Sequence, residues 1–198
     1  VSVSGYRPFE RNHNFLKDIT LIMGQKQQLI WDLPPMDSLQ VNAAVYGINE
    51  SEAKSRIKEL GDMLEIEKEL TRPVRKLSLG QRMKAELLAA LLHRPSILFL
   101  DEPTLGLDVN AQSRVRNFLT EYNRQTGATI LLTSHYMADI TALCPRVLCI
   151  HQGELFYDGE LDSLTNQLSP KREVKVELKK STSQDDFSGY GEIKSHND

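Results

Sequence analysis

The stretch Leu77-Ser78-Leu79-Gly80-Gln81 is followed, after an amphipathic segment, by the apolar run Ile97-Leu98-Phe99-Leu100 and the acidic pair Asp101-Glu102. The first stretch is typical of a polar turn that opens a helix, and helix N-termini bind phosphate groups. The second is typical of a buried strand that delivers two carboxylates to the edge of a sheet, where such proteins bind ligands. Together the two stretches indicate an α/β protein that handles phosphates.

Strands and helices alternate on both sides of this stretch. Apolar runs predict strands at 21–23, 97–100 and 129–133, and helical spacing of apolar residues predicts one helix from Ser78 to before Pro95 and a second that ends near Gly127. The strands are apolar throughout, so we expect a parallel sheet that helices cover on both faces. Lys84, within the first of these helices, is expected to be solvated.

The flanking segments carry weaker signals. Alternation predicts a strand at 1–6, and the segment from Asp37 to about Leu70 is predicted to be helical, with Asn49 as a helix N-cap. We expect a hairpin from 146–150 and 154–157, followed by a short helix that opens at Asp158-Gly159. The domain is predicted to close near Leu168, and a polar tail with one strand candidate, 174–178, follows it.

Composition narrows the classes of function. The chain has 198 residues, 40% of them hydrophobic, and a formal charge of −3 with dispersed basic residues, which disfavours a dominant nucleic-acid role. No apolar run approaches the roughly 18 to 20 residues that cross a bilayer. The two cysteines, Cys144 and Cys149, lack the spacing of a zinc site and are interpreted as reduced packing residues.

The acidic pair is the first candidate for chemistry. At the carboxyl end of a buried parallel strand, Asp101 could hold magnesium and Glu102 could polarise an attacking water. The alternative is a polar strand end that only caps the next element.

The residues that follow favour the first interpretation. With Pro103-Thr104-Leu105-Gly106-Leu107-Asp108, the chain resembles the ATP-binding subunits of ABC transporters. Five elements stand in the order of that family: Gln25, the signature-like stretch 77–81, Asp101-Glu102, Asp108 and His135. The resemblance implies a P-loop NTPase-like layered parallel sheet over residues 1–168, truncated at its N-terminus, with an inserted helical subdomain at about 37–93. Residues 169–198 would be a tail or the start of an accessory domain.

The resemblance also implies roles for the matching positions, with ATP and Mg²⁺ as the cofactors. Ser78, Leu79, Gly80 and Gln81 would form the turn that contacts the γ-phosphate of ATP held by the opposite subunit, although Leu79 stands where glycine is commonest. Asp108 would also lie in the nucleotide site. Asp101 and Gln25 would contact magnesium, while Glu102 and His135 would be catalytic, with His135 reaching the γ-phosphate.

One expected motif is absent from the sequence: no G-x-x-x-x-G-K-[ST] phosphate loop occurs in it. ATP binding by this chain alone is therefore expected to be weak or absent. The favoured explanation is that the chain is a fragment of a longer, working ATPase subunit. The alternative is a non-catalytic subunit that lends its signature turn to a partner's ATP. On the fragment explanation we expect the isolated chain to aggregate or to melt at low temperature, and a sharp transition at high temperature would count against that explanation.

The predicted assembly follows from the resemblance. We expect the chain to pair head to tail with a second ATP-binding subunit and to power transmembrane permease subunits from the cytoplasmic face of the cell membrane. The layout and the segment Asp32-Leu33-Pro34-Pro35 look most like the ABC-2 type exporters. The rival class is an ABC-type ATPase of DNA repair or translation. No nucleic-acid partner is expected, because Leu77 follows Gln25 by 52 positions (77 − 25), which leaves no room for a long coiled-coil insert.

Overall fold

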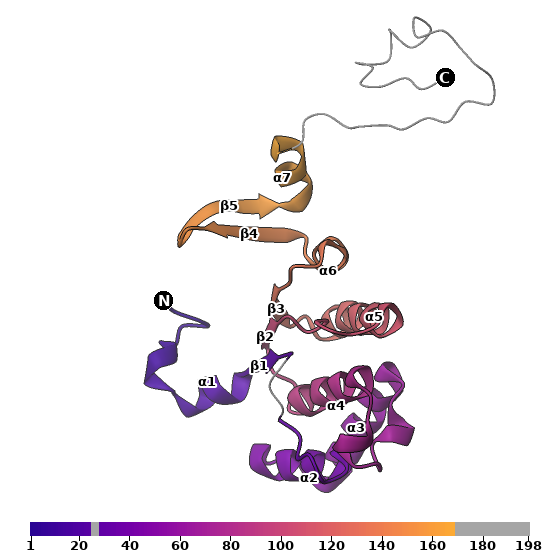
Figure 1. Ribbon diagram of the computed structural model, residues 1–198. Helices are drawn as coiled ribbons and strands as arrows, with labels where there is room; N and C mark the ends of the chain where they lie inside the picture. The colour runs from indigo at the N-terminus through magenta and orange to yellow at the C-terminus, as the bar shows by residue number, and fades with distance from the viewer. Residues whose placement is uncertain (25–27, 169–198) are drawn as a thin grey trace, which may run out of the picture.

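A parallel sheet of three strands forms the centre of the structure (Figure 1). The computed structural model describes residues 1–24 and 28–168. The strands β1 (Ile19–Met23), β2 (Ile97–Asp101) and β3 (Thr129–Thr133) lie in the order β1-β2-β3. Their register pairs Met23 with Asp101 and Asp101 with Thr133, so the carboxyl ends of all three strands lie in one row. The predicted α/β architecture with a parallel sheet is confirmed.

Four longer helices carry most of the remaining structure, and their ends follow capping rules. They are α2 (Pro35–Tyr46), α3 (Glu50–Leu64), α4 (Leu79–Leu91) and α5 (Val109–Thr126). Asn49 caps α3 as predicted, because its side chain accepts a hydrogen bond from the backbone N–H of Glu52. Gly127, at φ 67°, ends α5 in the left-handed conformation that glycine adopts without strain.

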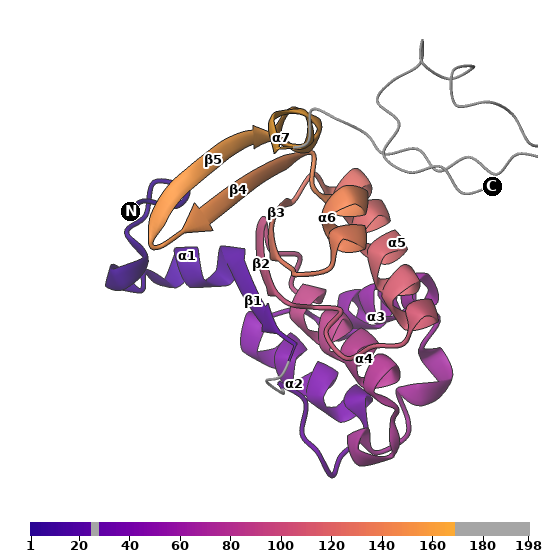
Figure 2. The same cartoon turned by 45° about the horizontal axis from the view of Figure 1, so that its top comes forward.

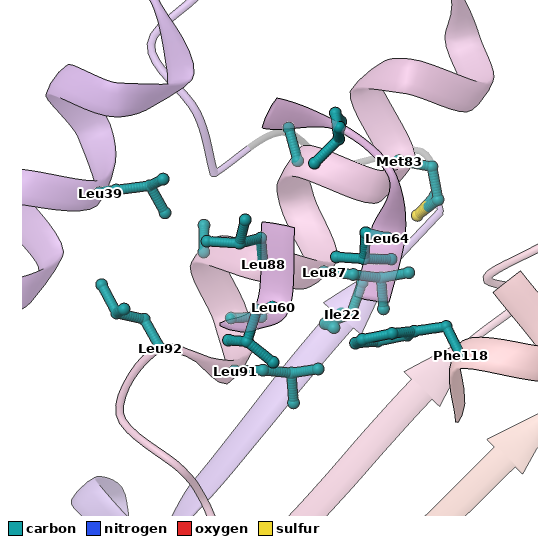
Figure 3. Close-up of a cluster of buried hydrophobic side chains, with 14 of the residues drawn as sticks. Ile22, Leu39, Leu60, Leu64, Met83, Leu87, Leu88, Leu91, Leu92 and Phe118 are labelled. Carbon is teal, nitrogen blue, oxygen red and sulfur yellow. The ribbon is translucent and has the colours of Figure 1, made fainter. Parts of the chain in front are cut away.

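The core is centred on α4. Every residue from Met83 to Leu92 is buried, so this helix is surrounded by the sheet, α2, α3 and α5 rather than lying on the surface. Figure 3 shows the side chains that meet there, among them Leu39 of α2, Leu60 of α3, Ile22 of β1 and Phe118 of α5. The helix predicted from Ser78 to before Pro95 is confirmed, but Lys84 is 7% exposed, so its predicted solvation is wrong.

Only one face of the sheet is covered within the described residues. Burial alternates along each strand, with Leu98 and Leu100 of β2 facing α4 and α5 while Leu21 and Leu131 are 46% and 49% exposed on the other face. Figure 1 shows the helices α4 and α5 on one side of the strands. The prediction of helices on both faces is therefore wrong for this part of the chain, although the strand sequences are apolar on both sides.

The shorter elements flank this centre. They are the 3-10 turns η1 (Pro8–Glu10), η2 (Glu67–Glu69) and η3 (Val74–Lys76), the helices α1 (His13–Asp18), α6 (Met137–Leu143) and α7 (Leu161–Leu168), and the antiparallel strands β4 (Arg146–His151) and β5 (Glu154–Glu160). The predicted hairpin is confirmed, and Figure 2 shows it as a separate two-stranded sheet with α7 at its end. None of the helices in the described ranges is both long and apolar enough to span a membrane.

Near both ends of the described residues the structure departs from the sequence expectations. The predicted strand at 1–6 is wrong: Val3 and Tyr6 form an isolated bridge across a turn at Ser4-Gly5, where both residues have positive φ angles. The predicted helix opening at Asp158-Gly159 is also wrong, because β5 continues through both residues and α7 begins at Leu161. The tail and its strand candidate at 174–178 lie outside the described residues.

Candidate functional site

Three of the predicted site residues meet at the carboxyl edge of the sheet. Asp101 is the last residue of β2, Glu102 follows it, and His135 lies two residues after the end of β3. Nδ1 of His135 lies 2.9 Å from Oε2 of Glu102, a hydrogen bond between residues 33 positions apart. Parallel strands bring this about, since their carboxyl ends project their next residues to the same side.

Glu102 is held in an uncommon backbone conformation. Its φ is +50°, a left-handed value that costs free energy for a residue with a Cβ atom. Its N–H donates to the backbone oxygen and to the side-chain oxygen of Thr133, at 3.1 and 3.2 Å. The strained turn directs the carboxylate of Glu102 away from the direction of β2 and toward His135. Strain of this kind is concentrated at functional sites.

Thr133 is a site residue that the sequence reasoning missed. Besides accepting from Glu102, its hydroxyl donates to Oδ1 of Asp101 at 2.6 Å. One threonine at the end of β3 thus fixes both members of the acidic pair. The available signal was its position, because the register places the last residue of β3 opposite the last residue of β2.

Gly24 is the second missed residue. Its N–H donates to the backbone oxygen of Asp101, and a Cβ atom built on it would lie 2.4 Å from the backbone oxygen of Glu102. No other residue type fits there without displacing the acidic pair, because the contact is with backbone rather than with a flexible side chain. The predicted site residue Gln25, which comes directly after Gly24, lies outside the described residues.

The signature-like turn forms the N-terminus of α4. The Ser78 hydroxyl accepts from the N–H of Gln81 at 3.2 Å, and Oε1 of Gln81 accepts from the N–H of Ser78 at 2.9 Å, which makes a capping box. The hydroxyl hydrogen of Ser78 remains a donor, and the backbone N–H of Gly80 lies in the first helical turn, where helices offer unpaired N–H groups. Leu79 is 38% exposed beside them.

The turn packs against the residues that follow the acidic pair. A Cβ atom on Gly80 would lie 2.9 Å from Cβ of Ala111, and one on Gly106 would lie 3.2 Å from the side chain of Leu79. Asp108 caps α5, its side chain accepting from the N–H of Ala111 at 2.9 Å. The predicted residues therefore fall into two groups. Asp101, Glu102 and His135 form the sheet-edge group, and the signature turn lies with Asp108 at the start of α5.

The sheet-edge group suits a magnesium ion that is shared with phosphates. Within 1–24 and 28–168 no three His, Cys, Asp or Glu side chains are grouped as a protein-only metal site. Magnesium keeps several waters and commonly binds through one or two carboxylates plus substrate phosphates. The exposed carboxylate of Asp101, oriented by Thr133, fits that need. The N-terminal N–H groups of α4 suit a phosphate.

Two buried charges brace the helix that carries the signature turn. Both carboxylate oxygens of Glu86 accept from the N–H of Gln28, at 3.0 and 3.1 Å, and Oε1 also accepts from Leu29. Nζ of Lys84 donates to the backbone oxygen of Leu64, the last residue of α3, at 2.6 Å. Burial raises the pKa of Glu86 and lowers the pKa of Lys84, because it disfavours the charged form of each.

Comparison with known proteins agrees with this geometry. Residues 6–137 match the family model described as "AAA domain, putative AbiEii toxin, Type IV TA system". The chain is 34% identical over 164 residues to "ABC transporter ATP-binding protein NatA" of Bacillus subtilis, an alignment that covers 83% of this chain and 66% of NatA. The chain belongs to the ABC transporter ATP-binding proteins. The suspected family is confirmed.

Two further matches support the assignment. "Linearmycin resistance ATP-binding protein LnrL" of Bacillus subtilis is 31% identical over 147 residues, covering 74% of this chain and 47% of LnrL. The solved "Structure of ATP binding subunit of ABC transporter" superposes with a TM-score of 0.72 at 27% identity, covering 84% of this chain and 69% of that one. This ABC ATP-binding chain thus spans between about half and two thirds of the length of these two Bacillus relatives.

Proposed function

We propose that this protein is the ATP-binding and ATP-hydrolysing subunit of an ABC transporter. The observation that carries the proposal is the hydrogen bond between His135 and Glu102, beside Asp101, at the carboxyl edge of the parallel sheet. A carboxylate and an imidazole in contact at this edge can act on a water next to a phosphate. The relatives are named as ATP-binding proteins, so we infer that the phosphate compound is ATP.

Each side chain has a task in this proposal. Glu102 accepts a proton from the attacking water, and the ring N–H of His135 donates to Oε2 of Glu102 and fixes the direction of the carboxylate. Asp101 would hold Mg²⁺, which when bound neutralises charge that develops on the phosphates. Gln25 is proposed to assist Asp101, as the sequence suggested.

The signature turn serves a different phosphate. Ser78 and Gly80 present a hydroxyl and an N–H at the start of α4, and the helix dipole favours an anion there. We propose that they bind the γ-phosphate of ATP held by a second ATP-binding subunit. Leu79, beside them, is 38% exposed, and Val109 of α5 is 76% exposed. Two exposed apolar side chains beside a polar turn are the composition expected of a subunit interface, which supports the head-to-tail pair.

The sequence contains no G-x-x-x-x-G-K-[ST] phosphate loop, so the described donors do not surround the β and γ phosphates by themselves. ATP binding by these 198 residues is therefore proposed to be weak. The alternative function, a subunit that only donates its signature turn in trans, would use Ser78 and Gly80 and leave Glu102 unused.

A set of exposed apolar side chains close in sequence supports a permease partner. It lies on α2 and the segment before it and consists of Ile30 (47% exposed), Trp31 (45%), Leu33 (40%), Val41 (55%) and Val45 (71%). Because single exposed apolar residues are ordinary but a group of five is not, we propose that this set contacts a transmembrane permease subunit at the inner face of the membrane. The resistance named for LnrL favours an exporter of the ABC-2 type.

The test is steady-state ATP hydrolysis by the protein assembled with its partner subunits. We expect Glu102→Gln to lower kcat by about 100-fold or more while ATP binding persists, because the amide cannot accept the proton. Asp158→Asn, which breaks an exposed ion pair with Arg146 on the hairpin, is the control and should hydrolyse ATP at the unsubstituted rate. Hydrolysis by Glu102→Gln at that same rate would refute the catalytic proposal and favour the in-trans alternative.

A further inference from the structure

A buried carboxylate lies behind His135. Asp139 of α6 has an exposed fraction of 0%, yet its side chain is fully engaged. Its Oδ1 accepts from the guanidinium of Arg116 at 2.8 Å. Its Oδ2 accepts from the hydroxyl of Ser134 at 2.9 Å and also from the hydroxyl of Thr104. Three donors from three separate segments satisfy one carboxylate.

Two of those donors adjoin the candidate catalytic residues. Thr104, itself 0% exposed, stands two residues after Glu102, and Ser134 comes directly before His135. The Ser134 hydroxyl also accepts from the N–H of Tyr136 at 3.1 Å, so the residues on both sides of His135 are anchored. A single carboxylate therefore links the turn that carries the base to the turn that carries the imidazole.

The third donor ties this link to the body of the protein. Arg116 belongs to α5, and its side chain is 16% exposed. A buried charge is tolerated only where a partner and hydrogen bonds replace the lost hydration, and Arg116, Thr104 and Ser134 together supply both. The left-handed backbone of Glu102 is thus held between β2 on one side and the anchored Thr104 on the other.

We propose that Asp139 is a positioning residue that sets the contact between His135 and Glu102. It touches neither nucleotide nor water and acts through the hydroxyls of Ser134 and Thr104. The proposal rests on the function proposed above, because the contact that it sets is the one assigned to hydrolysis. Disturbing Asp139 or its partners should lower kcat with little change in KM for ATP, since the donors of the signature turn are untouched.

The sharpest test uses a matched pair at Thr104 in the assembled protein. Thr104→Val keeps the shape of the side chain and removes its hydroxyl, whereas Thr104→Ser keeps the hydroxyl. We expect Thr104→Val to lower kcat by about 10- to 100-fold with KM for ATP within about twofold, because small displacements of catalytic groups have costs of this size. Thr104→Ser should restore most of kcat. Equal kcat in the two variants, or an unchanged kcat in Thr104→Val, would overturn the proposal.

A second comparison addresses Asp139 itself. Asp139→Asn removes the charge that Arg116 faces and should lower kcat with KM retained, whereas Asp158→Asn, the same change in an exposed ion pair with Arg146, should leave both constants unchanged. A rise in KM by a factor as large as the fall in kcat would show general damage to the site and would overturn a positioning role.

Hydrogen exchange separates failure of this inference from failure of the proposed function. If the unsubstituted assembly hydrolyses no ATP, the function fails, but amide exchange at 133–137 can still be compared by mass spectrometry. Faster exchange there in Thr104→Val than in Thr104→Ser supports the link through Asp139. Identical exchange in the two variants overturns it.

Discussion

Glu86 is an acidic residue placed where water does not reach it. The side chain is 5% exposed, and its carboxylate accepts the backbone N–H groups of Gln28 and Leu29. Those bonds favour the charged form, but burial is the larger influence and raises the pKa of Glu86 above its ordinary value of 4.5. Burial of this carboxylate therefore lowers the stability of the fold, while its hydrogen bonds fix α4 to the chain after β1.

This gives a prediction for pH. Since the folded pKa of Glu86 is raised, its contribution to stability is complete below about pH 4.5 and is lost as pH rises through the folded pKa. Glu86→Gln does not titrate, so the unfolding free energy of the unsubstituted protein relative to this variant should fall as pH rises above about 4.5. Urea unfolding at a series of pH values measures it.

Glu121→Gln is the matched control. Hydrogen bonds from Arg124 and Gln125 lower the pKa of Glu121 to about 2, so its contribution is present above the ordinary value and is lost as pH falls toward 2. The unfolding free energy of the unsubstituted protein relative to Glu121→Gln should fall as pH falls toward 2, which is the opposite pH dependence to that of Glu86. A difference between the unsubstituted protein and Glu86→Gln that is constant with pH would contradict the assignment for Glu86.

For single residues, the sequence identified those that stand in the order of the ABC family motifs. It missed those whose contacts form only when the strands pair. Asp101, Glu102 and His135 stood in a familiar series and lie together. Thr133 and Gly24 did not, because a threonine at a strand end and a glycine after a strand are common, and only the register of three strands gives them their contacts. Lys84 was misjudged because its aliphatic stem crosses the core to reach the carbonyl of Leu64.

At the scale of elements, the caps decide where helices begin. Asn49 accepts from the N–H of Glu52 at 2.9 Å and from the hydroxyl of Ser51 at 2.7 Å, at the start of α3. Asn49→Ala removes these acceptors and should lower the free energy of unfolding by about 1 kcal/mol. Asn117→Ala, the same change at an exposed site within α5, should instead be neutral or stabilising by up to about 0.7 kcal/mol, because alanine is the better helix former. Equal losses in denaturant unfolding would contradict the capping role.

Elements with caps, helical spacing or apolar runs were predictable, but the conformations at 1–6 and at 158–159 were not. The apolar positions of α4 and α5 and the hairpin 146–160 follow from local pattern. At 1–6 the alternation of residue types is that of a strand, but Gly5 adopts φ +80° and turns the chain back on itself. Asp158 and Gly159 carry a turn signal that the hairpin overrides, since Asp158 pairs with Arg146 across the two strands.

Within residues 1–24 and 28–168, the parallel sheet has one covered and one uncovered face. Leu21, Phe99 and Leu131 are aligned in one row across the three strands, on the face that α4 and α5 do not cover. The sequence shows apolar residues on both faces but not which face this part of the chain covers. Likewise, family order named both groups of site residues, yet only the fold shows the signature turn packed against α5 and the remaining residues at the sheet edge.

An exposed apolar row predicts aggregation. Leu131→Thr, at a half-exposed position, should reduce binding of an apolar dye and raise solubility at a cost of less than about 1 kcal/mol, since threonine suits a strand. Leu132→Thr, the neighbour that packs on the core, should lower the unfolding free energy by about 2 kcal/mol or more. Dye fluorescence and thermal melting of the two variants check this. Equal melting temperatures would refute the asymmetry of the two faces.

The length of α4 would turn a small tilt of the helix into a large displacement of its N-terminus. Its 13 residues make a rod about 20 Å long, with the Ser78 turn at one tip and Glu86 near the middle. A tilt of about 10° about the far end would carry that tip by about 3 Å over this length, further than a hydrogen bond can stretch. The same tilt would pull Gln28 and Leu29 along through Glu86, so the Ser78 turn and the chain after β1 would move together.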